Sequence, residues 1–242
     1  QDYNLSFSGG NDMSVFNVSA GYYNQDGTIK YNKWERFSIR ANSEFKVGKV
    51  TFGENLAFSR EQSSGGMGNM GEDTPIGQLI KMQPVIPVYD IDGYFSSGKA
   101  VTLGNGSNPV GQSFKSKDNI GRYQRLVGNF YGSVDIIDGL QFKSSFGFSF
   151  FNSIYKGFSF PTYENSEPNT STGLDEDYET QTSWTWTNTL TYNKTFADNH
   201  NVSVLVGYEA IDYNRNRMEG GMNNYITWDQ NAWYIQDALA DP

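Results

Sequence analysis

The sequence predicts an all-β protein that forms a segment of an antiparallel transmembrane β-barrel. Three observations predict it: long runs in which apolar and polar residues alternate, a tight turn after every second run, and wide connections between the others. Outer-membrane barrels have short turns on the periplasmic side and long loops outside. A soluble sandwich has no physical reason to collect all its long loops at one end. We therefore expect short periplasmic turns and long extracellular loops.

Eight runs have the period of two that is typical of strands. The period is clearest between Leu140 and Phe150, where Phe142 and Phe146 share one face and Lys143 points to the other. Most runs reach the roughly nine to eleven residues that a tilted membrane-crossing strand needs. The expected strands are approximately 2–8, 13–23, 28–46 with a bend, 50–61, 122–136, 140–155, 179–196 and 201–213.

The connections between these strands are of two kinds. The tight turns are expected at 9–12, 47–49, 137–139 and 197–200. The widest connections are a long extracellular loop at 62–121 and a second one at 156–178. In the first loop Thr74 and Pro75 predict the N-cap and first position of a short helix. We also expect a short helix in the tail, between Trp228 and Leu239.

Composition agrees with a barrel wall and disfavours some other functions. The 242 residues carry a net charge of −9, which disfavours binding to a nucleic-acid backbone. Aromatic residues make up 16% of the chain, and barrels use them as girdles at the membrane surface. No apolar run approaches the roughly 18 residues of a membrane helix, but only alternate residues of a barrel strand face lipid. There is no cysteine, which excludes disulfides.

Eight strands are expected to be one arc of a larger wall. No signal peptide is visible at Gln1, and the chain ends at Asp241-Pro242 without a closing strand, so we interpret it as a fragment. An isolated arc would leave unpaired strand edges in lipid, which is not viable. The remaining strands are therefore expected elsewhere in the full protein.

The ordered succession of strand and loop motifs resembles the SusC/RagA-type TonB-dependent transporters. Each motif is a loose strand pattern, but their order is specific and covers nearly the whole chain. The stretches that carry the resemblance are 9–12, 18–30, 35–42, 84–94, 108–110, 139–147 and 204–209.

The resemblance implies a barrel of about 22 strands that is plugged by an N-terminal domain. It implies a multi-pass protein of the Gram-negative outer membrane that imports oligosaccharides or peptides. The implied partners are a SusD-like surface lipoprotein, the TonB-ExbB-ExbD complex and outer-membrane lipid. Residues 1–242 would be a partial barrel domain, because the plug, the TonB box and the remaining strands are absent from them.

No residue set predicts catalysis, and we expect no enzymatic activity and no cofactor. Gly66, Gly68 and Gly71 spell a dinucleotide fingerprint but lack the βαβ context that the motif needs. His200 is the only histidine, so a histidine-based triad or metal site has no second partner. The acidic run 175–179 could hold Ca²⁺, but a solvated acidic tip is the simpler interpretation.

The candidate contact residues lie on the polar faces of the strands and in the tail. Tryptophans have two interpretations, an interfacial girdle or a platform for a ligand, and Trp184 and Trp186 follow the lipid-face register of a girdle. The expected lumen-facing or ligand-contacting residues are Arg36, Arg40, Tyr123, Arg125, Asn129, Tyr131, Lys143, Trp228 and Trp233.

Two alternatives remain open from sequence. The chain could be a soluble or surface-anchored β-rich glycan-binding module, in which Phe142, Phe146 and Val204 would be buried against a second sheet. It could also be part of an unplugged passive porin. The environment of the apolar side chains separates the first alternative from a barrel wall, because they would contact lipid in a barrel wall and a second sheet in a soluble module.

Overall fold

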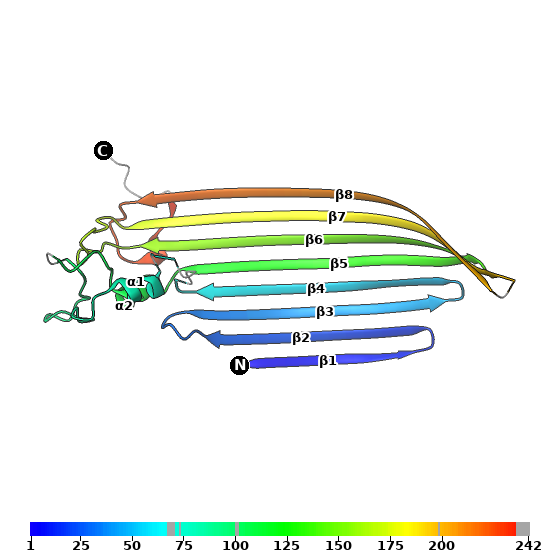
Figure 1. The fold of residues 1–242 in the computed structure, drawn as a ribbon, viewed down its shortest axis with the longest axis horizontal. Helices are drawn as coiled ribbons and strands as arrows, with labels where there is room; N and C mark the ends of the chain where they lie inside the picture. The colour runs from blue at the N-terminus through cyan, green and yellow to red at the C-terminus, as the bar shows by residue number, and fades with distance from the viewer. Residues whose placement is uncertain (67–70, 73, 100–101, 198, 236–242) are drawn as a thin grey trace.

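The strands of the chain form a single antiparallel sheet (Figure 1). The computed structural model describes residues 1–66, 71–72, 74–99, 102–197 and 199–235. Eight strands pair in chain order from β1 to β8. Their bounds are β1 Asp2–Asn11, β2 Ser14–Asp26, β3 Lys33–Val47, β4 Val50–Ser64, β5 Ile120–Ile137, β6 Leu140–Ser159, β7 Gly173–Phe196 and β8 His200–Asn223.

The two ends of the sheet differ. At one end, which we call the short-turn end, tight connections follow β1, β3, β5 and β7. At the other, the loop end, lie the long connections, both helices and the tail after β8 (Figure 1). The predicted asymmetry is confirmed, although Asp198 of the last predicted turn lies outside the described residues.

The hydrogen-bonding register separates an apolar face from a polar face. Residues directly opposite each other in antiparallel strands share a face. One such row crosses six strands and contains only apolar residues: Val47, Val50, Val134, Phe142, Leu190 and Val206. With the rows beside it, this row forms an apolar band that occupies alternate positions of 3–7, 16–22, 37–47, 50–58, 126–134, 140–150, 184–192 and 202–210.

The apolar band is uncovered. Phe52 is 48% exposed, Trp186 46% and Val204 50%. Among the described residues no second sheet packs on this face. Glu54 interrupts the band, and Ser43, directly opposite on β3, donates a hydrogen bond to its carboxylate. The interleaved layers of a soluble sandwich are therefore not what this segment forms.

Several strands extend further toward the loop end than the alternation predicts. β7 begins at Gly173 rather than 179, and β8 continues to Asn223 rather than 213. In these extensions the side chains are mostly polar on both faces, so periodicity does not reveal them, while the backbone ladder continues unbroken. The predicted start of the third strand at 28 is wrong, because residues 27–32 form the β2–β3 connection.

Two short helices lie in the β4–β5 connection. α1 spans Pro75–Lys81, and the Thr74 hydroxyl accepts a hydrogen bond from Gly77 N as the expected N-cap. α2 spans Pro109–Lys115 and was not predicted, although Asn108 caps it in the same way. No helix among the described residues is long and apolar enough to cross a membrane.

The packed core of the described residues lies at the loop end. Leu174, Tyr225 and Trp233 are buried there, and Phe158 and Phe160 pack against them. The tail therefore folds back onto the ends of β6 and β7. In the described part of the tail, up to residue 235, the one helical turn is Gln230–Ala232, shorter than the predicted helix, and residues 236–239 of that prediction lie outside the described residues.

Candidate ligand-facing surface

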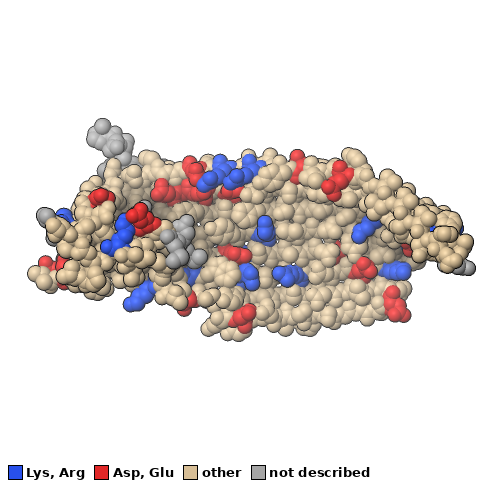
Figure 2. All heavy atoms as spheres, in the orientation of Figure 1, with Lys and Arg blue, Asp and Glu red and all other residues tan. Residues whose placement is uncertain are grey.

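Seven of the predicted contact residues lie on the polar face of the sheet. Cross-strand pairing places Arg36 opposite Glu61, and Glu61 opposite Tyr123. Residues an even number of positions away along the same strands, or directly paired with such residues, share this face. The remaining members of the set that lie here are Arg40, Arg125, Asn129, Tyr131 and Lys143. In Figure 2, side chains of both charges are distributed along the strands.

Neighbouring side chains on the polar face are tied to one another. The Tyr131 hydroxyl donates a hydrogen bond of 2.6 Å to Glu44, and the Lys143 ammonium lies 4.7 Å from the centre of the Tyr131 ring. Ser145 donates to the Asn129 amide oxygen at 2.7 Å. These contacts hold the hydrogen-bond donors and acceptors of the polar face in fixed positions. A solvent-accessible surface of this kind suits weak binding of a polar solute.

An aromatic cavity of about 450 Å³ lies where the polar face meets α1 and α2. Trp34, Tyr123 and Tyr155 line it from the sheet, and Pro75 of α1 and Gln112 of α2 line it from the loop. The Arg36 guanidinium lies 5.3 Å from the centre of the Trp34 ring. Aromatic faces with polar groups around them fit a ring or a planar group of a polar ligand.

Tyr155 was not among the predicted residues of this cavity. It faces Gly121 on β5, and it shares the odd register of β6 with Lys143. That register was visible in the sequence. What the sequence did not show is that α2 lies over this part of the sheet, because the helix itself was not predicted.

An ion-pair ladder extends the polar face along β7 and β8, beyond the apolar band. Arg215 donates two hydrogen bonds to Glu179, of 2.7 and 2.9 Å, and Arg217 donates three to Asp177, of 2.7, 3.1 and 3.3 Å. The Arg215 hydrogen bond lowers the pKa of Glu179 to about 2, and the Arg217 hydrogen bond lowers the pKa of Asp177. Both carboxylates therefore stay charged at neutral pH.

The acidic run 175–179 is part of a strand and not an acidic loop tip. Glu176 points to the opposite face from Asp177 and forms an ion pair of 3.3 Å with Lys156. No group of three or more potential metal ligands comes together among the residues that the structure describes.

Trp228 lines a second cavity, of about 370 Å³, at the loop end. The residue is 62% exposed, and its ring stacks on Phe160 with centroids 5.8 Å apart and planes 11° apart. Phe114 and Lys117 contribute to the same cavity from the end of α2 and the residues after it. Trp228 is thus placed where a solute could reach it at the loop end of the sheet.

Trp233, in contrast, is fully buried. Its ring stacks on Tyr225 at 4.7 Å, and its indole N–H donates a hydrogen bond of 2.7 Å to the Thr227 carbonyl. The predicted ligand contact is therefore corrected to a packing role, because no part of the side chain is open to a solute.

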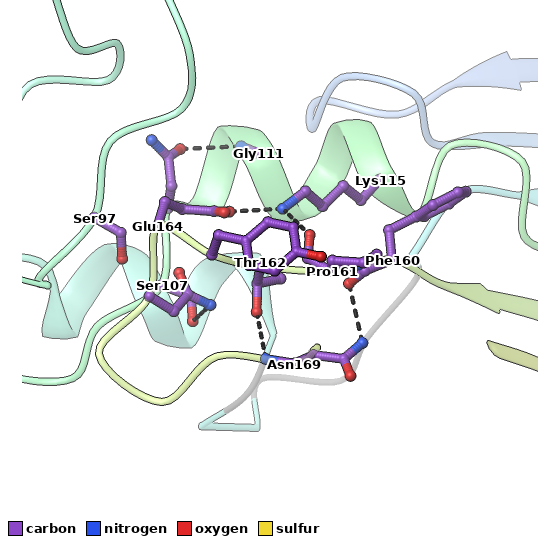
Figure 3. Close-up of polar contacts among 12 residues, drawn as sticks. Ser97, Ser107, Gly111, Lys115, Phe160, Pro161, Thr162, Glu164 and Asn169 are labelled. Atoms are coloured by element: carbon purple, nitrogen blue, oxygen red, sulfur yellow. Dashed lines mark hydrogen bonds and ion pairs between the residues drawn. The ribbon is translucent and has the colours of Figure 1, made fainter. Parts of the chain in front are cut away.

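The two long loops are held together by α2 (Figure 3). The Lys115 ammonium forms an ion pair of 2.6 Å with Glu164 and donates to the Pro161 carbonyl at 3.1 Å. The Asn165 amide donates to the Ser107 hydroxyl at 3.0 Å. The β4–β5 and β6–β7 loops are therefore in direct contact and form one connected layer at the loop end of the sheet.

Comparison of the whole chain with known proteins gives consistent matches. The chain is 31% identical over 230 residues to the TonB-dependent receptor P3 of Formosa agariphila, covering 92% of this chain and 22% of that protein. It is 26% identical over 209 residues to the TonB-dependent receptor P39 of the same organism, covering 85% and 19%. The chain thus spans about a fifth of the length of these curated relatives. No family model matches.

Solved structures match the fold. The RagAB peptide importer in its closed-closed state superposes with a TM-score of 0.75 at 19% identity, covering 99% of this chain and 27% of that one. At this identity the likeness concerns the fold alone. It places the eight-stranded sheet as an arc of a larger β-barrel.

Proposed function

We propose, from the premise that this chain is a β-barrel segment of the SusC/RagA type of TonB-dependent transporter, that it forms part of the wall of an outer-membrane importer. The proposed activity is passage of a polar nutrient oligomer through the barrel, not chemical conversion of it. Residues 1–242 would be one arc of the barrel domain, closed by further strands and plugged by a separate domain of the whole protein.

The observation that carries this proposal is the opposition of the two faces. The apolar band is exposed on one side, while arginine, lysine and carboxylate side chains occupy the other. A barrel wall needs this combination, because lipid covers the outside and water or solute fills the inside. The roughly nine residues of the band on β8, 202–210, match the length of a tilted crossing.

The polar face gives the segment its part in transport. We propose that Arg36, Tyr123 and the aromatic cavity beside them contact the substrate near the loop end. The remaining lumen-facing residues would line the path below: Arg40, Arg125, Asn129, Tyr131 and Lys143. The mixed charges and the many hydroxyl and amide groups favour a neutral or zwitterionic polar oligomer, since neither sign dominates.

The short-turn end is proposed to face the periplasm and the loop end the outside. Energy would come from the TonB-ExbB-ExbD complex acting on the plug domain, and a SusD-like lipoprotein would cover the loop end. The substrate would be an oligosaccharide or a peptide. RagAB, a relative in fold, is a peptide importer, and this analogy supports a peptide as the substrate.

The experiment is a binding measurement on the full transporter with size-fractionated oligosaccharides and a tryptic peptide mixture as probes. The double variant Trp34→Ala/Tyr123→Ala is expected to weaken binding of the accepted class about tenfold, as loss of aromatic anchors does at other sites. Trp186→Ala, on the apolar face, is the matched control and should leave affinity unchanged. Equal affinity of both variants and the wild type would contradict the proposal.

A further inference from the structure

Two arginines lie side by side on the apolar face of the sheet, just beyond the apolar band. Phe58 pairs with Leu126 at the edge of the band. In the next two rows toward the loop end Arg60 pairs with Gln124, and Gln62 pairs with Arg122. Arg60 and Arg122 are therefore diagonal neighbours on adjacent strands, with Cα atoms roughly 7–8 Å apart. Both side chains are exposed.

Neither guanidinium has a carboxylate partner among the described residues. Arg122 donates one hydrogen bond of 3.0 Å, to the Gln62 side chain, and Arg60 forms no ion pair with any residue that the structure describes. The nearest carboxylate of this face, Glu35 opposite Gln62, is paired with Lys33 at 3.0 Å. On the other side, β6 offers Asn152 and Ile154, which carry no charge.

Two like charges at this spacing repel each other unless an anion lies between them. The guanidinium groups of Arg60 and Arg122 and the side-chain amides of Gln62 and Gln124 offer many N–H donors, and none of the four side chains is negatively charged. Such a set of donors suits recognition of a phosphate. In the ion-pair ladder of β7 and β8, in contrast, Arg215 and Arg217 both have carboxylate partners.

The position of the pair selects the source of the phosphate. The arginines follow the last apolar row of β4 and β5 directly, at the depth where hydrocarbon gives way to head groups. Their stems can lie along the edge of the band while the charges reach the head-group layer. At the short-turn end the same face carries a single cation, Lys194 of β7, among the strand residues that the structure describes.

We propose that Arg60 and Arg122 together bind the phosphate of an anionic lipid head group in the leaflet on the loop side of the membrane. The inference rests on the membrane location given under the proposed function. It assigns this chain a lipid site that is separate from the transport path, because the pair points away from the polar face.

The test uses the full transporter purified in detergent, with short-chain phosphatidic acid as the probe and native mass spectrometry to count bound lipids. Arg60→Gln/Arg122→Gln is expected to reduce lipid affinity about tenfold. Arg36→Gln/Arg40→Gln removes the same charge from the opposite face of the neighbouring strand and should leave lipid affinity unchanged. An arm with inorganic phosphate in place of the lipid should show no binding at the same concentration.

Equal lipid affinity in both double variants and the wild type would overturn the inference. If the arginine variant does not fold, the wild type decides: its lipid affinity must fall steeply with added salt, and a flat salt response contradicts the site. Heat-modifiable migration of the wild type separates the two proposals. Absence of heat-modifiable migration would contradict the proposed function. A heat-modifiable protein whose lipid affinity does not depend on Arg60 and Arg122 would contradict only this inference.

Discussion

The Lys115 ammonium lies 2.6 Å from the Glu164 carboxylate, and this ion pair joins α2 to a loop 49 residues further along the chain. Both side chains are largely shielded from solvent, with 22% and 21% exposed. The pair is therefore less screened than a surface contact, and it fixes the two long loops relative to each other.

Loss of this ion pair should loosen the loop end without affecting the sheet. Lys115→Ala is expected to lower the local stability of residues 160–172 by about 1 kcal/mol, measured as faster amide hydrogen exchange. Lys117→Ala is the control, because its ammonium is more exposed and lies 4.0 Å from Asp118. Equal exchange in the two variants would show that the ion pair does not hold the loops together.

Asn108 is expected to be the main organiser of the β4–β5 loop. Its side-chain oxygen accepts from the N–H groups of Val110 and Gly111, and its amide donates to the carbonyls of Val88 and Ser96, both at 2.7 Å. Asn108→Ala should cost about 1–2 kcal/mol of loop stability, because it removes a helix cap and leaves two carbonyls without a donor.

The two roles of Asn108 can be separated by limited proteolysis. Asn108→Ser retains an oxygen that can cap α2 but has no amide to reach Val88 and Ser96. We expect this variant to keep the helix and to become cleavable between 88 and 96. Cleavage that matches the wild type would mean that the amide bonds do not hold this segment.

The two tail tryptophans should respond to substitution in opposite ways. Trp233→Ala empties a fully buried site and is expected to destabilise the loop-end core by about 3–5 kcal/mol. Trp228→Ala removes a mostly exposed ring and should cost less than about 1 kcal/mol while reducing binding of the probe ligands. Thermal unfolding and ligand titration of both variants measure the difference, and a stability loss at Trp228 as large as that at Trp233 would contradict it.

The strands and tight turns followed from alternation and turn chemistry because each depends on neighbouring residues. The extension of β8 to Asn223 could not be predicted in this way. Polar groups lie on both faces of the last residues of this strand, and only pairing with β7 keeps them extended. Thr74-Pro75 and Asn108-Pro109 both place an N-cap residue before a proline, although a helix is predicted from the sequence only at the first. The burial of Trp233 depends on contacts with Tyr225, Phe158 and Phe160, which no local pattern reveals.

The ladder on β7 and β8 predicts a specific response to acid. The pKa of Glu179 is about 2 in the folded protein, below its ordinary value of 4.5, mainly because of the hydrogen bond from Arg215. The pair therefore stabilises the folded state above pH 4.5, and that contribution disappears as the pH falls toward 2.

Glu179→Gln should lower the unfolding temperature at neutral pH and have progressively less effect toward pH 2. Glu167→Gln, at an exposed loop position, is the control and should leave the unfolding temperature at neutral pH unchanged. Thermal scans of the full-length protein across this range measure both variants. A Glu179→Gln effect that stays constant down to pH 2 would show that the ion pair does not carry the difference.

The most direct test of the central claim is a spin-label scan of β6 in the full-length protein reconstituted into vesicles. Residues 1–242 contain no cysteine, so within this segment the only labels are those introduced at Phe146→Cys on the apolar face and Ser145→Cys on the polar face, and any cysteine elsewhere in the full-length protein is first replaced by serine. The account predicts that the label at 146 is accessible to oxygen in the lipid phase, whereas the label at 145 is accessible to a water-soluble nickel chelate. If both labels are shielded from oxygen, or the accessibilities do not alternate, the apolar band does not face lipid and the account is wrong.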